Sequence, residues 1–453
     1  MFSLNESKIN HLLSNACAPS ESQLIAILQK AEQKKGLSLE EATTLLQIND
    51  ESQLQKLFTS AGKIKNEIYG NRLVLFAPLY ISDYCVNDCA YCGFHCSNKN
   101  LNRKLMTTEE IAEQTSIIIG MGHKRILLEV GEHPDTTIDY VCDAIRTIYK
   151  TKVGNGEIRR INVNIAATTT ENYKKLKEAG IGTYQLFQET YHNETYQLLH
   201  HGPKADYERQ LTAHERAFEA GIDDYGVGVL FGLYDYRFEV LSLLSHAKYM
   251  EEKYGVGPHT ISVPRFQLAN SVVFSPKHLV SDNNFLKLIA IIRLAVPYTG
   301  MIISTRETPK IRAKAFHIGI SQTSAASRTA IGGYSSKENA QFTLADHRSV
   351  EDVIKDISKH GLLPSFCTAC YRSNRTGDRF MQLAKTGNIN HLCRPNAILT
   401  FKEYLMDYTS AETRKIGEQL IVHELEKIES QDRRLETQNR LKRIEQGERD
   451  LYF

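Results

Sequence analysis

The sequence predicts an α/β protein built on a closed (β/α)8 barrel of the TIM type. Eight apolar, β-branched runs are continuous rather than alternating, as in parallel strands buried on both faces. Helical patterns separate these runs, and the alternation extends over the length of such a barrel, about 250 residues. An open doubly wound sheet shows the same alternation, but the count of eight favours closure. The predicted strands are residues 72–81, 125–132, 161–168, 183–190, 225–233, 259–266, 300–307 and 317–325.

Helical segments flank the predicted barrel of residues 66–340. Residues 1–65 have a helical, polar-faced pattern, and we expect them to form an N-terminal helical cap. Between the first two strands, Thr107 and Glu110 form a capping box before apolar residues at helical spacing, which predicts the start of a helix. Residues 341–453 combine a cysteine-containing segment with charged helical stretches. We therefore expect a mainly helical C-terminal domain.

The overall charge of the chain is close to neutral, with a formal net charge of +2. It gives no electrostatic reason to bind nucleic acid or an anionic membrane surface, so neither is expected as a partner. The first residues lack the basic and apolar regions of a signal peptide, and no apolar run approaches the about 18 residues of a membrane span. We expect a cytoplasmic protein.

Three cysteines, Cys85, Cys89 and Cys92, follow the first predicted strand in "SDYCVNDCAYCGF". Barrel enzymes place their active sites in the loops after the strands. Three thiolates from one loop can hold three irons of a [4Fe-4S] cube and leave the fourth iron open. A zinc site would need a fourth ligand, which His95 or Cys96 could supply. The odd total of nine cysteines also favours metal or redox chemistry over disulfides.

A second group of cysteines, Cys367, Cys370 and Cys393, lies in the C-terminal segment. Three thiolates again suit a cuboidal cluster with one open iron. A CxxC pair alone could be a redox pair, but the third cysteine argues against that interpretation. A zinc site would need a fourth ligand, and His391 is the local candidate. We therefore expect a second iron-sulfur site.

The spacing of the first group, with aromatic Tyr91 just before the third cysteine, resembles the radical S-adenosylmethionine (SAM) superfamily. The resemblance implies a [4Fe-4S] cluster that binds SAM and cleaves it to a 5′-deoxyadenosyl radical. "LEVGE" is similar to the family's Gly-Gly-Glu motif, with valine in place of the first glycine. An arginine in "YERQLTAHERAFEAGI" matches the family arginine for the SAM carboxylate, which a planar guanidinium can bind with two hydrogen bonds. The SAM-contacting residues implied are Tyr91, Gly131, Glu132 (ammonium), Glu189 (ribose) and Arg209 (carboxylate).

The motifs "GPHTISVPR", "STRE", "FCTACYR" and "GERDLYF" resemble the tyrosine lyase family of [FeFe]-hydrogenase maturation over nearly the whole chain. The resemblance implies cleavage of L-tyrosine to p-cresol and dehydroglycine at the first cluster. Dehydroglycine would then give carbon monoxide and cyanide, and the product would be an iron-carbonyl-cyanide-cysteine unit. Implied partners are SAM, tyrosine, free cysteine and other maturation proteins, including a GTPase scaffold. The second [4Fe-4S]-type cluster, with an additional iron, would be held by Cys367, Cys370, Cys393 and His259.

Strand polarity predicts that the two clusters lie at opposite mouths of the barrel. His259 opens the sixth predicted strand, so it lies at the mouth opposite to the loop that carries Cys85. A tunnel through the barrel would then carry the intermediate. Arg306 and Ser324 end the seventh and eighth strands and point into the upper mouth, where we expect Arg306 to bind the tyrosine carboxylate. The neighbouring acid, Glu307, points the other way on a strand and is a poor partner for this arginine.

Two alternatives remain open from the sequence. A sister family, the 2-iminoacetate synthase of thiamine biosynthesis, shares the barrel and the tyrosine cleavage but lacks the C-terminal CX2CX22C segment. An iron-sulfur scaffold or carrier would bind two clusters without chemistry, which leaves Glu132 and Arg209 without a purpose. Where the lyase family usually has Ser-Ala-Gly-Ser, this chain has Ala326, which adds a methyl group near the expected substrate.

Overall fold

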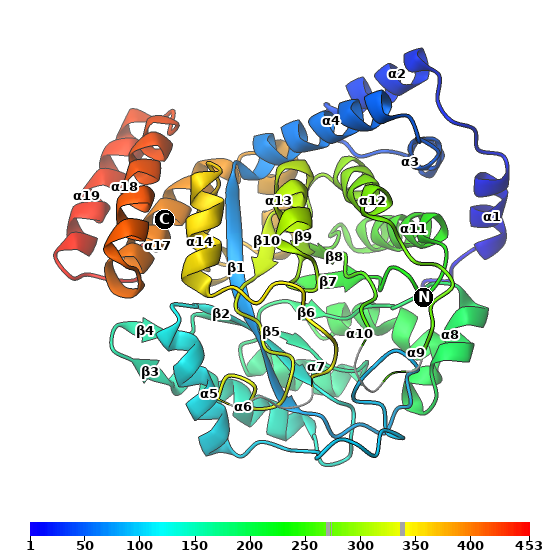
Figure 1. The fold of residues 1–453 in the computed structure, drawn as a ribbon, viewed down its shortest axis with the longest axis horizontal. Helices are drawn as coiled ribbons and strands as arrows, with labels where there is room; N and C mark the ends of the chain where they lie inside the picture. The colour runs from blue at the N-terminus through cyan, green and yellow to red at the C-terminus, as the bar shows by residue number, and fades with distance from the viewer. Residues whose placement is uncertain (269–271, 273, 336–339) are drawn as a thin grey trace.

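The computed structural model describes residues 1–268, 272, 274–335 and 340–453, and its parallel strands form a closed barrel (Figure 1). Barrel strands lie side by side in chain order, and pairing of Val74 with Gln322 joins the last strand to the first. The expectation of a closed (β/α)8 barrel is confirmed. The barrel strands are β1 (Arg72–Ser82), β2 (Arg125–Val130), β5 (Arg160–Asn164), β6 (Tyr184–Gln185), β7 (Tyr225–Gly228), β8 (Thr260–Ser262), β9 (Gly300–Ile303) and β10 (Gln322–Ser324).

Most of the strands are shorter than the apolar runs that predicted them. The run 317–325 was expected to be one strand, but a helix continues to Ile318 and β10 begins only at Gln322. That part of the prediction was wrong because the buried end of a helix is as apolar as a strand buried on both faces. Three further strands were not expected: the hairpin of β3 (Lys152–Val153) and β4 (Gly156–Glu157), and β11 (Leu363–Ser365).

Helices surround the barrel on its outside. The first of them starts at the expected capping box, in which the Thr107 side chain accepts a hydrogen bond from the backbone N–H of Glu110. These helices are α5 (Thr108–Gly120), α6 (Ile138–Lys150), α7 (Thr170–Glu178), α8 (Asn193–Leu199), the 3-10 turn η1 (Pro203–Ala205), α9 (Tyr207–Leu211), α10 (Ala213–Glu219), α11 (Tyr236–Tyr254), α12 (Asp282–Ala295) and α13 (Pro309–Ile318).

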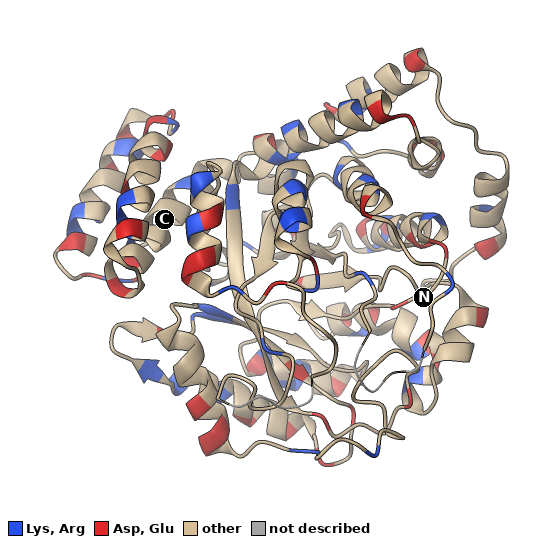
Figure 2. Ribbon diagram, viewed as in Figure 1, with Lys and Arg blue, Asp and Glu red and all other residues tan. Residues whose placement is uncertain are grey.

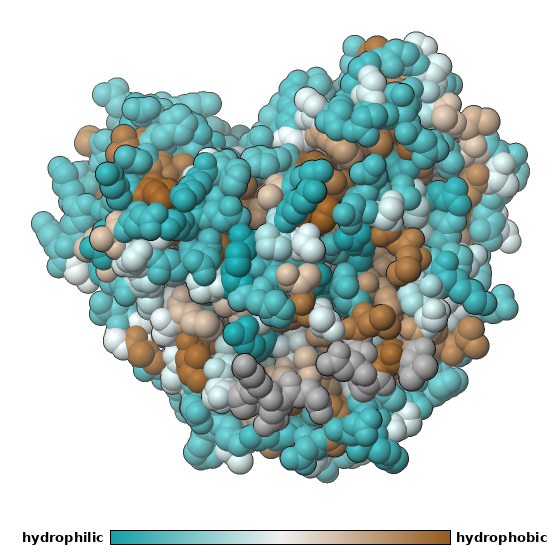
Figure 3. Space-filling view, in the orientation of Figure 1, coloured by the Kyte–Doolittle hydropathy of each residue, from teal (hydrophilic) through white to brown (hydrophobic). Residues whose placement is uncertain are grey.

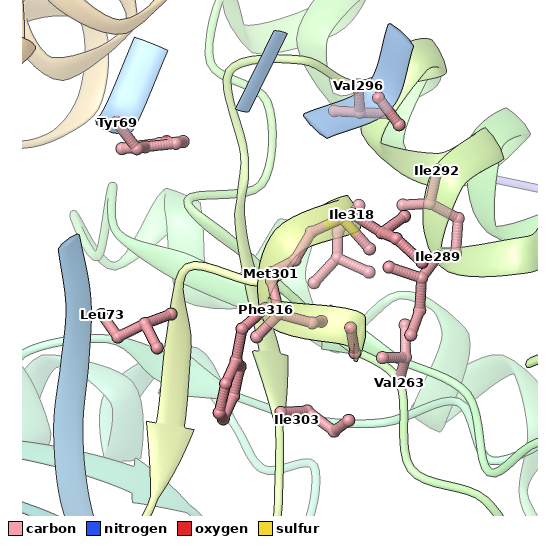
Figure 4. Packing of buried hydrophobic residues seen from close by; sticks show 14 of the residues in the cluster. Tyr69, Leu73, Val263, Ile289, Ile292, Val296, Met301, Ile303, Phe316 and Ile318 are labelled. Carbon is pink, nitrogen blue, oxygen red and sulfur yellow. The ribbon is translucent and has the colours of Figure 1, made fainter. Parts of the chain in front are cut away.

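Alternate strand residues point outward to these helices or inward to the barrel axis. Figure 4 shows Ile289 and Ile292 of α12 and Phe316 of α13 packed around Met301 and Ile303 of β9. The inward positions are unlike this apolar layer, because many of them are polar or glycine and line cavities. The outer layer therefore holds the fold, and the inner positions are available for chemistry.

The chain ends lie against the barrel on separate sides (Figure 1). The N-terminal helices run past the expected boundary at residue 65, since the last of them leads directly into β1. They are α1 (Glu6–Ser14), α2 (Glu21–Ala31), α3 (Leu39–Leu46) and α4 (Glu51–Tyr69). The C-terminal helices are α14 (Val350–Lys359), α15 (Ala369–Arg372), α16 (Gly377–Thr386), α17 (Asn390–Tyr408), α18 (Ala411–Glu426) and α19 (Gln431–Glu445).

The C-terminal segment joins the barrel sheet through β11. Leu363 and Ser365 pair in parallel with Arg72 and Val74 at the start of β1, and Cys367 follows two residues later. This pairing brings the second cysteine group beneath the barrel. The division into residues 1–65, 66–340 and 341–453 stays a proposal.

The surface is polar and mixed in charge. Basic and acidic residues alternate along α14, α18 and α19 without a patch of one sign (Figure 2). The face shown in Figure 3 is mostly hydrophilic, with hydrophobic residues scattered over it. Among the described residues, no helix combines the length and apolarity that crossing a membrane requires.

Candidate active site

The first cysteine group lines a cleft at the upper mouth, where the carboxyl ends of the strands meet. Cys85, Cys89 and Cys92 all face this cleft, from the loop that follows β1. The loop is held by backbone hydrogen bonds from Val86 to Glu132 (2.8 Å) and from Ala90 to Leu199 (3.0 Å). Three thiols from one fixed loop are therefore directed at a common space, which we call the cysteine cleft.

The thiols of the cysteine cleft fit a cationic group. Burial raises the pKa of both Cys89 and Cys92, so their thiolates need a nearby positive charge to form. No three His, Cys, Asp or Glu side chains in the described part of the chain converge on a point that suits one metal ion. His95, the zinc alternative, instead contacts Asp88 (3.0 Å) and Ser97 (2.9 Å). The three thiols that face the cleft are the sulfur ligands that a [4Fe-4S] cluster with one open iron requires.

Four of the five expected SAM residues line the same cleft, and the fifth, Arg209, lines an adjoining pocket together with Glu132. Glu132 and Arg209 form an ion pair of 2.5 Å, and the Glu132 carboxylate also accepts a hydrogen bond from Asn87 (2.8 Å). Gly131 packs against the backbone of Tyr84, and a Cβ atom at this position would lie only 2.3 Å from the Tyr84 carbonyl oxygen. Only glycine fits this position, and its backbone stays open to the cleft.

Two further expected residues complete the cleft wall. The Tyr91 hydroxyl contacts His200 Nε2 at 2.8 Å, which fixes the ring between two cysteines. Glu189 has a φ of 68°, a backbone strain of about 1–2 kcal/mol for a residue with a side chain. Its carboxylate accepts a hydrogen bond from Lys204 (2.8 Å), which also lines the cleft. The strained backbone therefore holds a charged pair at the cleft.

A second cavity, which we call the chamber, opens beside the cleft inside the upper mouth. Its volume is about 1000 Å³, including the solvent at its opening, and both Arg306 and Ser324 line it. The Ser324 hydroxyl accepts a hydrogen bond from the backbone N–H of Thr305 (3.2 Å), which fixes the loop that presents Arg306. The structure thus brings the two residues expected at the substrate into one cavity.

Arg306 is available to a ligand. Glu307, its neighbour, pairs with Arg265 at an Oε1–Nε distance of 2.8 Å, so it is not the partner of Arg306. The guanidinium instead lies over the ring of Phe342, and burial lowers its pKa. No carboxylate among the described residues lies within ion-pair distance of it. Ala326, on the nearby loop, has a φ of 51°, a conformation that favours the glycine usual in the family.

The second cysteine group lines a smaller cavity of about 500 Å³ at the opposite mouth, which we call the lower pocket. Cys367, Cys370 and Cys393 face it together with His259, which lies directly before β8. Burial raises the pKa of Cys367, and that of Cys370 to about 12. His391, the zinc alternative, is exposed and does not line the pocket. The two cysteine groups therefore lie at opposite mouths, as strand polarity predicts.

The lower pocket holds His259 in a fixed orientation. Its Nδ1 lies 3.1 Å from the buried carboxylate of Asp224, and its ring stacks on Phe380 at 3.9 Å. Burial opposes ionisation of Asp224, but His259 and Arg160 outweigh it and hold the pKa of this carboxyl at about 2. With Nδ1 lying 3.1 Å from a carboxylate oxygen, Nε2 is the ring nitrogen that is left to bind a metal ion.

Comparison with known proteins shows which families this chain resembles. Residues 79–244 match the radical SAM superfamily, and residues 262–363 match the biotin and thiamin synthesis associated domain. The 2-iminoacetate synthase of Salmonella typhimurium is 31% identical over 345 residues, which cover 75% of this chain and 89% of that protein. The crystal structure of HydG, a maturase of the [FeFe]-hydrogenase, is 55% identical with a TM-score of 0.96 and covers 99% of both chains.

The chain belongs to the HydG family of radical SAM enzymes. HydG from Carboxydothermus hydrogenoformans is also similar, with 42% identity, a TM-score of 0.84 and 96% of each chain covered. HydG similarity thus includes the C-terminal cysteine segment, whereas the match to the 2-iminoacetate synthase leaves a quarter of this chain uncovered. Membership implies a [4Fe-4S] cluster and SAM, and the buried thiols of the cysteine cleft fit both.

Sequence reasoning missed several residues that the structure places in these HydG-type sites. Glu129 lines both the cleft and the chamber, and its signal was a lone charge inside the apolar run "RILLEV". Lys204 had no strand or motif to mark it. Asp224 and Arg125 stand at the lower ends of strands, and no motif in the sequence marks them.

Proposed function

We propose that this chain is a radical SAM lyase that cleaves L-tyrosine to p-cresol and dehydroglycine. Dehydroglycine is then converted to carbon monoxide and cyanide at the lower pocket, which yields an Fe-CO-CN unit for the active-site cluster of [FeFe]-hydrogenase. The observation that carries this proposal is a pair of three-cysteine sites at opposite mouths of one barrel, the lower of which includes a histidine.

The residues of the upper mouth have separate tasks in this proposal. Cys85, Cys89 and Cys92 would hold the [4Fe-4S] cluster, which together with SAM would supply the radical chemistry for removing hydrogen from the tyrosine amino group. Glu132 and Arg209 are already paired, and they offer opposite charges to the ammonium and carboxylate of SAM. In the neighbouring chamber, Arg306 binds the tyrosine carboxylate, and the apolar wall of the chamber encloses the phenol ring of tyrosine.

The lower pocket would hold the second cluster through Cys367, Cys370 and Cys393. His259 offers Nε2 to the additional iron, while Asp224 keeps the ring oriented. Arg125 lines the pocket and donates to the Cys367 carbonyl oxygen (2.9 Å). Its positive charge favours anionic groups such as thiolates, cyanide and the carboxylate of free cysteine.

Passage between the sites is proposed through the barrel interior. Among the described residues, the chamber and the lower pocket share no lining residue, so a layer of side chains separates them. Gln185 donates to Thr260 (3.2 Å) in that layer, and Arg125 donates to Gln322 (3.3 Å). These polar side chains offer hydrogen bonds to a small polar intermediate along the axis. A GTPase scaffold as recipient of the product rests on family resemblance alone.

The test is an anaerobic assay of the reconstituted protein with SAM, dithionite and L-tyrosine. It scores p-cresol, cyanide and carbon monoxide for wild type, Cys370→Ala and the control Cys17→Ala, since Cys17 is exposed and outside both sites. We expect all three products from wild type and control, and p-cresol without carbon monoxide from Cys370→Ala.

Other outcomes separate the alternatives. If wild type makes p-cresol without either diatomic, the 2-iminoacetate synthase activity takes the place of this proposal. If SAM is cleaved but tyrosine gives no p-cresol, the substrate is wrong. If SAM is not cleaved at all, the scaffold alternative stands.

A further inference from the structure

The boundary between the cysteine cleft and the chamber carries an acid with no assigned role, Glu129. It is the next-to-last residue of β2, inside the upper mouth, and it lines both cavities. Its register partners are Tyr80 on β1 and Asn164 on β5, and both of these face the same two cavities. Glu129 thus borders both the space of a ligand in the chamber and the space of a ligand in the cleft.

The other acids near this boundary are already paired. Glu189 pairs with Lys204 at 2.8 Å, and Glu132 pairs with Arg209 at 2.5 Å. Glu129 accepts a hydrogen bond from the neutral amide of Asn164, and no cation in the described part of the chain forms an ion pair with it. It is therefore the acid at this boundary that remains free to receive a cation from a ligand.

Arg306 stands in the same chamber, and no carboxylate among the residues that the structure describes pairs with it. A chamber with one unpaired guanidinium and one unpaired carboxyl is complementary to a zwitterion. An α-amino acid carries these two charges on neighbouring groups, and charge-assisted hydrogen bonds to both would fix its orientation.

We propose that Glu129 binds the α-ammonium group of the substrate and accepts one proton from it. This inference rests on the proposed function, because hydrogen removal from the amino group requires a neutral amine close to the cleft. In the step, an N–H bond of the ammonium breaks and its electron pair stays on nitrogen as the lone pair. In the ionised form of Glu129, which Arg306 favours, the proton passes to a carboxylate oxygen, and the carboxylate becomes a neutral carboxyl.

The surroundings of Glu129 suit this exchange. Burial raises its pKa to about 8, although Asn164 and Arg306 act in the opposite direction. The charged and titratable groups that face it are Tyr80 on β1, Glu189 after β6, Lys204 and Arg306 after β9. A carboxyl in this range has nearly the affinity of an α-amino group for a proton, about 8 in peptides, so transfer costs little.

The test measures binding without turnover, on the reconstituted holoenzyme with SAM and no reductant. Three probes are compared: L-tyrosine, 3-(4-hydroxyphenyl)propanoate, which lacks the amino group, and tyramine, which lacks the carboxylate. Wild type is expected to prefer tyrosine over the propanoate by about 10- to 100-fold, as for hydrogen bonds to charged groups. Glu129→Gln should reduce this preference to below about 3-fold and keep the preference over tyramine.

Controls make the outcome specific. Arg306→Gln should show the converse pattern, with the preference over tyramine lost. Glu171→Gln, an exposed acid on α7, should match wild type for every probe. A merely structural role of Glu129 would weaken all probes equally, and that result would overturn the proposal. The proposal would also be overturned if wild type bound the propanoate as tightly as tyrosine, and this comparison requires no variant.

A pH profile gives a second readout. Without Glu129 the ammonium must lose its proton to water, so the acid limb of kcat for p-cresol should move to higher pH in Glu129→Gln. An unmoved limb would contradict the proton transfer. If wild type makes no p-cresol, the proposed function fails, and the comparison of tyrosine with the propanoate still decides the role of Glu129.

Discussion

The two mouths of the barrel each collect three cysteines, yet their other charges differ. At the upper mouth, the cleft and chamber are lined by both signs: Glu129, Glu132 and Glu189 against Lys204 and Arg306. The described lining of the lower pocket has Arg72, Arg125 and His259 and no carboxylate. Mixed charge suits zwitterionic ligands such as SAM and an amino acid, whereas a basic lining suits thiolates and small anions.

The comparison shows how one barrel can support two chemistries. The upper site uses loops after the strands, which is the usual position in this fold. The lower site exists because β11 pairs with the start of β1 and carries Cys367 beneath the strands. Under the proposed function, the charge contrast suits an amino acid at the upper mouth and an anionic product at the lower one.

Removing one cysteine from the upper mouth gives the largest expected effect. Cys92→Ala should abolish SAM cleavage and therefore all products, because the upper cluster loses one of three ligands. The iron content of the lower site should stay unchanged, since its cysteines come from another segment. Iron analysis together with a p-cresol assay checks both statements. If Cys92→Ala still makes p-cresol, the assignment of the upper mouth is wrong.

Replacing the chamber arginine gives the next effect. Arg306→Gln removes the unpaired guanidinium and should lower kcat/KM for tyrosine about 100-fold, since a charge-assisted hydrogen bond to the carboxylate is lost. All three products should fall in parallel, because the change precedes both steps. Initial rates of p-cresol and carbon monoxide formation test this prediction. A fall in carbon monoxide alone would place Arg306 in the second step instead.

A change in the lower pocket should separate the two steps. Asp224→Asn keeps the shape of the side chain but removes the charge that lies 3.1 Å from His259 Nδ1. We expect the affinity for the additional iron to fall about 10-fold, as for other carboxylates behind metal-binding histidines, with p-cresol formation unchanged. Iron retention during dialysis against a chelator measures this effect. Equal losses of p-cresol and iron would indicate that Asp224 only supports the fold.

Much of the fold and of the site could be predicted because their signals are local. Continuous apolar runs marked the strands, and the spacing of Cys85, Cys89 and Cys92 marked a cluster loop. Strand polarity placed His259 at the lower mouth and Arg306 at the upper one, and both positions agree with the structure. Each of these inferences needed only residues close together in the chain.

Other features depend on contacts between distant segments. Strand β11 contains Pro364 and only three residues, and it exists because β1 offers a free edge at its start. Lys204 pairs with Glu189, and Asp224 lies beside His259. No sequence spacing predicts either pair. The apolar pattern at the end of α13 predicts a strand, because a buried helix and a buried strand share one composition.

The smallest expected effect distinguishes the acids of the two mouths by pH. Glu129 has a pKa raised from 4.5 to about 8 by burial, so the folded protein takes up a proton between these values. Its contribution to stability is therefore complete below pH 4.5 and is lost as the pH rises toward 8. Asp224, with a pKa of about 2, stays ionised throughout this range. Thermal unfolding of the unliganded protein is measured at acidic and at alkaline pH. As the pH rises, the Tm of wild type should fall by about 1–2 °C relative to the Tm of Glu129→Gln. A constant difference between the two proteins would mean that Glu129 is ionised in the empty chamber, in which case the upper mouth would hold its charge before the substrate arrives.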